Sequence, residues 1–323
     1  MNISDCLNNF AGKARSLLTC SFLCFGLLGA VEVQAATVVT LTASSLADSF
    51  HTGNGWSDGL APHAGADYQV NGSSVLRTTE TPTFGGDSLT IGNGGTSTAS
   101  LLLKGVMGGN PTLNIAHLTL NHGSINPGNS YKVTYTGNID LVSENKIEFT
   151  NQSGFTVSSS SLISGTGSLL ITSYTASTAP IVFKSSNTYS GGTTLNAGMM
   201  EVQAAGGLGV GDVTLLGTST LKLLSSSAIA SSAALYLNST ASVVLSYVGT
   251  STVYGLSFDG GTTLAAEGTW GAVGSGADHT SSLLSGTGLL LVSSTIPEPS
   301  SVALVAGVFV LLGAVIRRHS RAV

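Results

Sequence analysis

The sequence predicts an all-β protein whose body is a right-handed parallel β-helix, or β-solenoid, between an N-terminal signal helix and a C-terminal single transmembrane helix. Three observations favour this fold. Short segments that alternate apolar and polar residues recur along the body, the chain has 42 glycines among many Ser, Thr and Asn residues, and two phrases occur twice. Alternation gives a strand one buried face, and repeated short strands are typical of stacked coils. A β-sandwich is the alternative, because the repeats are imperfect.

Residues 1–35 have the pattern of a secretory signal peptide. Lys13 and Arg15 precede an apolar run over 16–31, and small residues at 33 and 35 predict cleavage between Ala35 and Ala36. The alternative is an uncleaved membrane helix, which a short run followed by a cleavage site disfavours. The prediction implies signal peptidase and the Sec translocon as partners, and an exported mature chain.

Cysteine and charge content exclude several kinds of site. Cys6, Cys20 and Cys24 all lie in the predicted signal peptide, so the mature chain has no disulfide, thiolate nucleophile or cysteine-bound metal. Between Ala36 and Ile296 there are six basic and thirteen acidic residues, which give a net charge of −7. Nucleic-acid binding needs a basic patch and is therefore not expected.

The body, residues 36–295, reads as a series of short strands. Leu113, Ile115, Leu118 and Leu120 alternate with polar residues, and Gly, Asn and Ser separate the segments as turn residues. No long stretch between the two ends has the periodicity of a helix. Strands are expected at 88–92, 100–106, 113–120, 131–137, 145–150, 168–173, 180–185, 212–217, 220–224, 233–238 and 241–247.

Two pairs of phrases suggest internal repetition. "LISGTGSLLI" (162–171) nearly matches "LLSGTGLLLV" (283–292), and "GGTTLNAG" (191–198) nearly matches "GGTTLAAEG" (260–268). Repeats of this kind indicate coils that bury their apolar faces against one another.

Residues 164–215 resemble the autotransporter-associated β-strand repeat. "GTGSLLI" (165–171) matches the opening of that family's pattern, "NTYSGGTTLNAG" (187–198) matches its core, and "LGVGDVTL" (208–215) resembles the lead into the next coil. The resemblance implies β-helical stalks or passengers on bacterial surfaces. It implies no catalytic residue, because none belongs to the motif.

The end of the chain, residues 296–323, resembles the PEP-CTERM sorting tail. Pro297, Glu298 and Pro299 precede an uncharged run over 300–316, and Arg317 and Arg318 follow it. The arginines would stay in the cytoplasm, which leaves the body outside the inner membrane. The resemblance implies cleavage near Pro-Glu-Pro by an exosortase-type membrane peptidase, and then passage to the cell surface or into exopolysaccharide. A permanent single-pass anchor is the alternative.

Two further segments, 49–72 and 268–279, resemble end segments of PEP-CTERM proteins that carry such repeats. Each contains one of the body's two tryptophans, Trp56 and Trp270. An open solenoid end exposes strand edges and apolar core. We expect both tryptophans to act as end plugs and not as sugar-stacking platforms.

The sequence offers no convincing catalytic or metal-binding set, so no catalytic, cofactor or metal residue is predicted. Glu144, Lys146 and Glu148 would share one face of a strand as a solvated stripe. His117 and His122, five apart, would face opposite sides of a strand. The predicted function is a structural or adhesion protein of a bacterial surface or matrix. The alternative is a carbohydrate-binding or carbohydrate-active β-helix protein, similar to a polysaccharide lyase or hydrolase.

Overall fold

The computed structural model describes residues 36–42, 49–78, 83–96, 98–103, 111–127, 132–148, 154–172 and 181–293. The chain divides into two compact units, Met1–Ala36 and Thr37–Val323, and the fold described below is that of the second. The predicted signal helix and transmembrane helix lie outside the described residues. Within those residues, no helix has the length and apolar character needed to cross a membrane.

The described part of the chain is built from 24 strands. In chain order they are β1 (Thr37–Thr40), β2 (Ala66–Val70), β3 (Val75–Arg77), β4 (Ser88–Ile91), β5 (Ala99–Leu103), β6 (Thr112–Leu120), β7 (Gly123–Pro127), β8 (Lys132–Leu141), β9 (Glu144–Glu148), β10 (Gly154–Val157), β11 (Leu162–Gly165), β12 (Ser168–Thr172), β13 (Ile181–Phe183), β14 (Thr193–Val202), β15 (Val213–Leu215), β16 (Ser219–Leu223), β17 (Ala234–Leu237), β18 (Ser242–Leu245), β19 (Thr250–Val253), β20 (Gly255–Ser257), β21 (Gly268–Gly271), β22 (His279–Thr280), β23 (Leu284–Gly286) and β24 (Leu289–Val292). A strand overlaps each of the eleven segments where the sequence predicts one.

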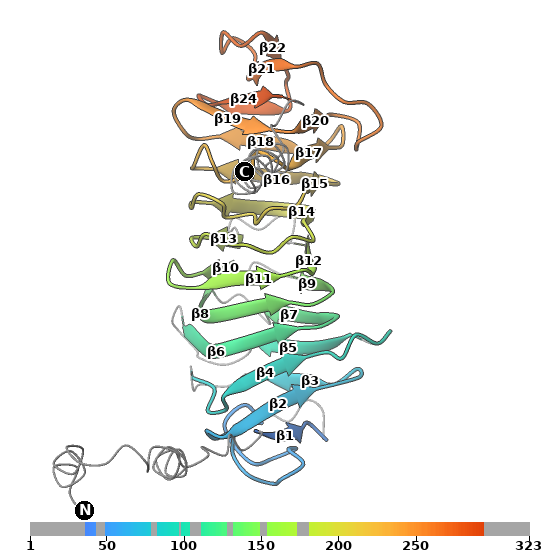
Figure 1. Cartoon of the computed structure of the whole chain (residues 1–323), viewed down its shortest axis with the longest axis vertical. Helices are drawn as coiled ribbons and strands as arrows, with labels where there is room; N and C mark the ends of the chain where they lie inside the picture. Colours follow the sequence, from blue (N-terminus) through green and yellow to red (C-terminus); the bar gives the residue numbers. More distant parts are fainter. Residues whose placement is uncertain are drawn as a thin grey trace, which may run out of the picture. The chain divides into compact units, whose positions relative to one another are not determined.

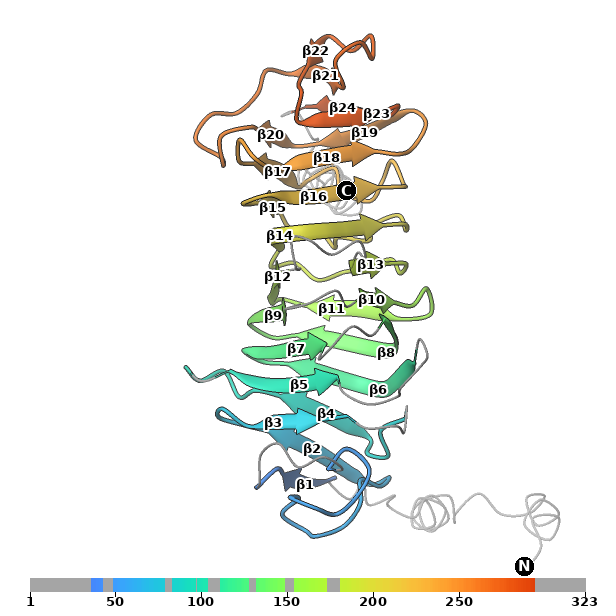
Figure 2. The ribbon, with the colours of Figure 1, turned by 180° about the vertical axis from the view of Figure 1, so that it is seen from behind.

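Twenty of the 24 strands stack in parallel, coil upon coil, and form three faces, and the other four form a small separate sheet (Figures 1 and 2). Face A contains β10, β13, β16, β18 and β23, with the first half of β6 and β8 and the second half of β14. Face B contains β1, β2, β4 and β11, with the second half of β6 and β8. Face C contains β3, β5, β7, β9, β12, β15, β17 and β20, with the first half of β14.

This pairing confirms the all-β parallel solenoid. Met200 pairs with Leu221 and Leu221 with Val243, so neighbouring strands lie about one coil apart in the sequence. A β-sandwich is excluded, because its sheets are built from antiparallel strands. Inward side chains alternate with outward ones, as in β2 and β16, and the inward ones form one continuous apolar core. Burial of this shared core is the main stabilising contribution.

Glycines allow the backbone to turn from one face to the next. β8 bends from face A to face B at Gly137, whose φ is +116°. A Cβ atom there would lie 1.9 Å from the carbonyl oxygen of Ile115 in the preceding coil. Gly165 and Gly286 occupy similar places, since a Cβ would lie 2.2 Å from the Leu141 oxygen and 2.4 Å from the Leu245 oxygen. At these corners the backbones of neighbouring coils are too close to each other to admit a side chain.

The repeated phrases do not occupy corresponding places in the coils. In the first pair each phrase contains two strands with a positive-φ glycine between them, but β11 pairs with β8 on face B whereas β23 pairs with β18 on face A. In the second pair 191–198 opens β14, whereas 260–267 is a largely exposed loop without a strand. This loop belongs to an insertion, because Val243 pairs with Leu284, 41 residues further on.

A loop around Trp56 closes the N-terminal end of the stack. Trp56 forms an antiparallel bridge with Leu41 beside β1, and the amide of Ser57 donates to the carbonyl of Thr40 at 2.9 Å. The Trp56 indole is 4% exposed, and its Nε1 donates to the Ser49 carbonyl at 2.6 Å. Its ring meets Tyr68 edge-on at 4.8 Å. The expected plug at this end is confirmed.

The C-terminal end is closed by part of the insertion. β21 runs antiparallel to β24, and β19 pairs with the other edge of β24. Trp270 on β21 is half-buried and packs against Phe258 at 5.1 Å between ring centroids. It therefore contributes to packing at this end, although less completely than Trp56 does at the other.

Candidate functional site

The predicted processing positions flank the described body. Ala36 is exposed and lies directly before β1, and the boundary between the two compact units falls between Ala36 and Thr37. At the other end the described residues stop at Ser293, four residues before Pro297. The remaining predicted sorting residues lie outside the described residues: Ala35, Pro297, Glu298, Pro299, Arg317 and Arg318. Between these positions the chain forms one stack of coils.

The acidic stripe on β9 lies as the alternation predicts. Glu144, Lys146 and Glu148 point outward, while Asn145 and Ile147 are buried. In the neighbouring coils Lys146 pairs with Ser124 and Leu170, and Glu148 pairs with Thr172. The coils on either side therefore add no acid or base to this row. A pair of carboxylates flanking one substrate bond, as glycoside hydrolysis needs, is not formed here.

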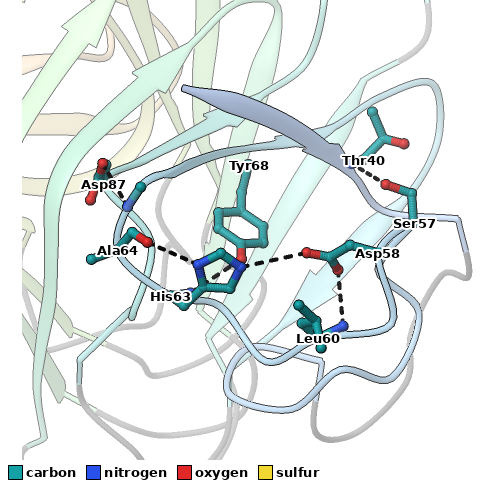
Figure 3. Close-up of polar contacts among 9 residues, drawn as sticks. Thr40, Ser57, Asp58, Leu60, His63, Ala64, Tyr68 and Asp87 are labelled. Carbon is teal, nitrogen blue, oxygen red and sulfur yellow. Dashed lines mark hydrogen bonds and ion pairs between the residues drawn. The ribbon is translucent and has the colours of Figure 1, made fainter. Parts of the chain in front are cut away.

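A cluster of ionisable side chains lies in the N-terminal end loop (Figure 3). The Nε2 atom of His63 is 3.7 Å from Oδ2 of Asp58, and its Nδ1 is 2.9 Å from the Ala64 carbonyl. The backbone amide of His63 donates to the phenol oxygen of Tyr68 at 3.1 Å. Asp87 accepts from the amide of Gly65 at 3.0 Å. Four polar side chains thus converge within a short part of the chain.

This cluster fixes a loop and does not form a catalytic pair. A separation of 3.7 Å is too long for a hydrogen bond between His63 and Asp58, and Asp58 instead accepts from the amide of Leu60 at 3.0 Å. Burial raises the pKa of Tyr68, so its phenol stays protonated. Sequence reasoning missed the cluster, although "SDGLAPHAGADY" (57–68) places its members close together. Their contacts are mainly with backbone amides, which have no signature in sequence.

The described residues contain no group of three His, Cys, Asp or Glu side chains placed to bind one metal ion. His117 is exposed on β6, while His122 lies in the turn after β6 with a φ of +57°. The two histidines therefore belong to different local structures.

The core of the repeat-like segment forms hydrogen bonds that hold neighbouring coils together. Asn187 is buried, and its Oδ1 accepts from the amide of Ile163 at 2.9 Å and from the hydroxyl of Ser185 at 2.9 Å. Its Nδ2 donates to the carbonyl of Gly207 at 2.6 Å. One side chain thereby joins three successive coils.

Tyr189 and Thr193 form a second buried contact in the same segment. The Tyr189 phenol and the Thr193 hydroxyl lie 2.6 Å apart, and burial raises the pKa of this phenol. The ring also fixes the next coil, since a Cβ on Gly209 would lie 3.1 Å from it. These residues stabilise stacking and present no reactive group to solvent.

Asp259 organises the loop that leaves β20. Its carboxylate accepts from the hydroxyl of Ser257 at 2.7 Å and from the amide of Thr263 at 2.9 Å. The Thr263 amide, followed by the Ser257 hydroxyl, lowers the pKa of Asp259 to about 2. The carboxylate therefore remains ionised at ordinary pH.

Acidification is expected to loosen this loop. A lowered carboxyl pKa means that ionised Asp259 favours the folded loop above its ordinary pKa of 3.8, and that this contribution is lost as the pH falls through about 2. Amide exchange at Thr263, followed by NMR, should accelerate severalfold over this range after correction for the intrinsic rate. Asp259→Ala should show the faster exchange already at neutral pH. Unchanged protection of Thr263 in that variant would contradict the assignment.

The outward rows of the body are largely uncharged. The longest row of face C comprises Val75, Ser100, Ser124, Lys146, Leu170, Thr194, Thr214, Tyr236 and Ser257. Ser100, Ser124 and Ser257 of this row are buried, whereas its other members are partly exposed. No family model, no curated protein and no solved structure matches the chain.

Proposed function

We propose that this chain is an exported structural or adhesion protein of a bacterial cell surface or extracellular matrix. In this proposal signal peptidase removes residues 1–35, and an exosortase-type peptidase reads the tail at 296–323 while the protein is held at the inner membrane. The body would be a right-handed coil, the hand that parallel crossover connections strongly favour. Exopolysaccharide or surface glycans are the partners it would meet.

One observation carries the proposal: the described solenoid fits between the two predicted processing positions. The first strand begins at Thr37, directly after the proposed cleavage site, and the last ends at Val292. Both edges of β24 are paired within the body. Cleavage at either position would therefore remove no described strand, which suits a protein released from its membrane intermediate in folded form.

The buried core of the repeat-like segment also supports a structural role. The residues of the repeat-like core are buried and bond to neighbouring coils, as Asn187 does with Ile163 and Gly207. A stack whose coils contact only their neighbours makes an extended scaffold. The proposal assigns no catalytic residue to the body.

Mass spectrometry of the mature protein tests the proposed processing. We expect a new N-terminus at Ala36 and loss of the residues that follow Pro-Glu-Pro. Glu298→Ala should keep the protein in the inner-membrane fraction, whereas Glu267→Ala, a change in an exposed loop, should leave sorting unchanged. Intact residues 300–323 in protein recovered from the cell surface would refute removal of the tail.

A further inference from the structure

Within the described part of the chain, the aromatic side chains that reach the surface all lie in the C-terminal coils. Among the described residues, every Phe, Trp and Tyr from Phe50 to Tyr189 is buried, and so is Tyr247. The remaining ones reach the surface: Tyr236, Tyr254, Phe258 and Trp270. Aromatic rings contribute most to stability when they are buried. A group of them left at the surface in one region therefore indicates an interaction site.

Two of these four rings already have partners within the chain. Trp270 stacks on His279 at 4.8 Å between centroids and packs against Phe258. Its Nε1 donates to the Ala266 carbonyl at 2.8 Å. Tyr236 and Tyr254 are different, because neither phenol makes a hydrogen bond to any residue in the described part of the chain. Tyr254 is 46% exposed.

Tyr254 lies at the corner between faces B and C, and Tyr236 lies beside this corner on β17 of face C, in the coil below. The amide of Tyr254 donates to the Ala233 carbonyl at 2.9 Å, which places it above the residue that leads into β17. One coil below, Oδ1 of Asp212 accepts from the amide of Ala234 at 2.8 Å. Burial, and then the nearby Asp212 carboxylate and Tyr254, raise the pKa of Tyr236. Three coils thus bring two phenols and a carboxylate to one corner.

The inserted loop lies against this corner. Gly261 lies beside Tyr236, and a Cβ at that position would come within 3.3 Å of the ring. Leu264 is 58% exposed and lies next to Gly255, where a Cβ would be 3.5 Å from its Cδ2. Glycine at 261 therefore lets the loop backbone lie against one side of the Tyr236 ring, and Leu264 adds apolar area at the edge.

The charges around the corner select the kind of ligand. Lys222, on face A, is the last Lys or Arg of the described body, and it pairs with Glu201 at 3.0 Å. Asp212 and Asp259 are the acidic residues nearest in sequence to Tyr236 and Tyr254. An anionic polymer would be repelled there. Aromatic rings pack against apolar faces of small ligands, and phenol and carboxylate groups hydrogen-bond hydroxyls.

We propose that Tyr236, Tyr254 and Asp212, with Leu264 at the edge, form a binding site for a neutral polysaccharide. The pyranose rings would lie against the two phenols, and Asp212 would accept hydrogen bonds from sugar hydroxyls. The inference builds on the proposed function, because it names the glycan class that a matrix protein of this kind would hold.

Affinity electrophoresis of the purified full-length protein in mild detergent tests this site. Native gels would contain a neutral β-glucan, a neutral galactomannan or anionic alginate. At least one neutral polysaccharide should retard the protein, and alginate should not. The double variant Tyr236→Ala/Tyr254→Ala should weaken binding at least tenfold. Val248→Ala, at a side chain that is 93% exposed elsewhere in these coils, should leave binding unchanged.

Three outcomes would overturn the site: no retardation by either neutral polysaccharide, retardation by alginate alone, or equal retardation of the wild type and the double variant. Melting curves followed by circular dichroism would show whether the double variant is folded, and Tyr254→Phe, which keeps the ring, should retain most of the binding. Processing of the tail is measured separately in cell fractions. Failure of glycan binding therefore leaves the sorting proposal standing, and the reverse also holds.

Discussion

Gly137→Ala is expected to destabilise the body by about 3–5 kcal/mol, among the largest effects of a single methyl group in this chain. Its Cβ would lie 1.9 Å from the Ile115 carbonyl oxygen, and that oxygen belongs to the backbone of the coil below. The φ of +116° adds strain for any residue with a side chain. Relief would require β6 and β8 to separate at the corner, which would also break the stack of coils there.

Urea unfolding followed by circular dichroism measures this loss. Gly249→Ala is the matched control, because Gly249 also has a positive φ (+97°) but has nothing within 4 Å of a Cβ. The control should lose only the conformational part, about 1–2 kcal/mol. Equal losses in the two variants would show that the corner tolerates the added methyl group. A much larger loss for Gly137→Ala would show that close approach of the coils decides the effect.

Asn187→Ala is expected to cost about 2–4 kcal/mol of the free energy of unfolding. The change removes three hydrogen bonds and leaves the amide of Ile163 and the carbonyl of Gly207 without their side-chain partner inside the stack. Buried polar groups without partners account for most of such a loss. Because the two groups lie in different coils, the variant should weaken the coupling between coils as well as the total stability.

Amide exchange and urea unfolding together check this second prediction. Asn196→Ala serves as the control, since Asn196 is exposed on the same strand, β14, and should change stability by less than about 0.5 kcal/mol. In Asn187→Ala the amide of Ile163 should exchange faster, whereas amides of distant coils such as that of Leu89 should change less. A stability within 0.5 kcal/mol of the wild type would show that water or a shifted neighbour replaces the side chain.

The strands were predictable because apolar and polar residues alternate locally with a period of two residues. Leu118 and Leu120 on β6 are buried as their alternation indicates, and the same holds for Val243 and Leu245 on β18. The burial of Trp56 was predictable as well, because an open solenoid end requires an apolar cover. Period, composition and the need to close the ends therefore determine the fold class without knowledge of the contacts.

The details that failed or were missed depend on contacts between coils. "GGTTL" begins a strand at Thr193 but lies in a loop at 260–264. Gly191 lies against the backbone of Gly167 in the neighbouring coil, where a Cβ would be 2.4 Å from the Gly167 carbonyl carbon, while the matching Gly260 has nothing within 4 Å. The residue types are the same at both places, and only their contacts with neighbouring segments differ. The corner formed by Asp212, Tyr236 and Tyr254 was missed for a similar reason, since three separate coils supply it.

The loop that covers β1 has a consequence for how the body acquires its structure. Its bonds join residues close in sequence, such as Thr40 to Ser57 and Trp56 to Ser49, and its aromatic partner Tyr68 follows soon after. Contacts of short sequence separation form quickly, and coils that touch only their neighbours can be added one at a time. If the chain crosses a membrane N-terminus first, as proposed, this end can fold before the rest has emerged. Each later coil can then stack on a coil that is already folded. The folded coils would also prevent the chain from moving back across the membrane.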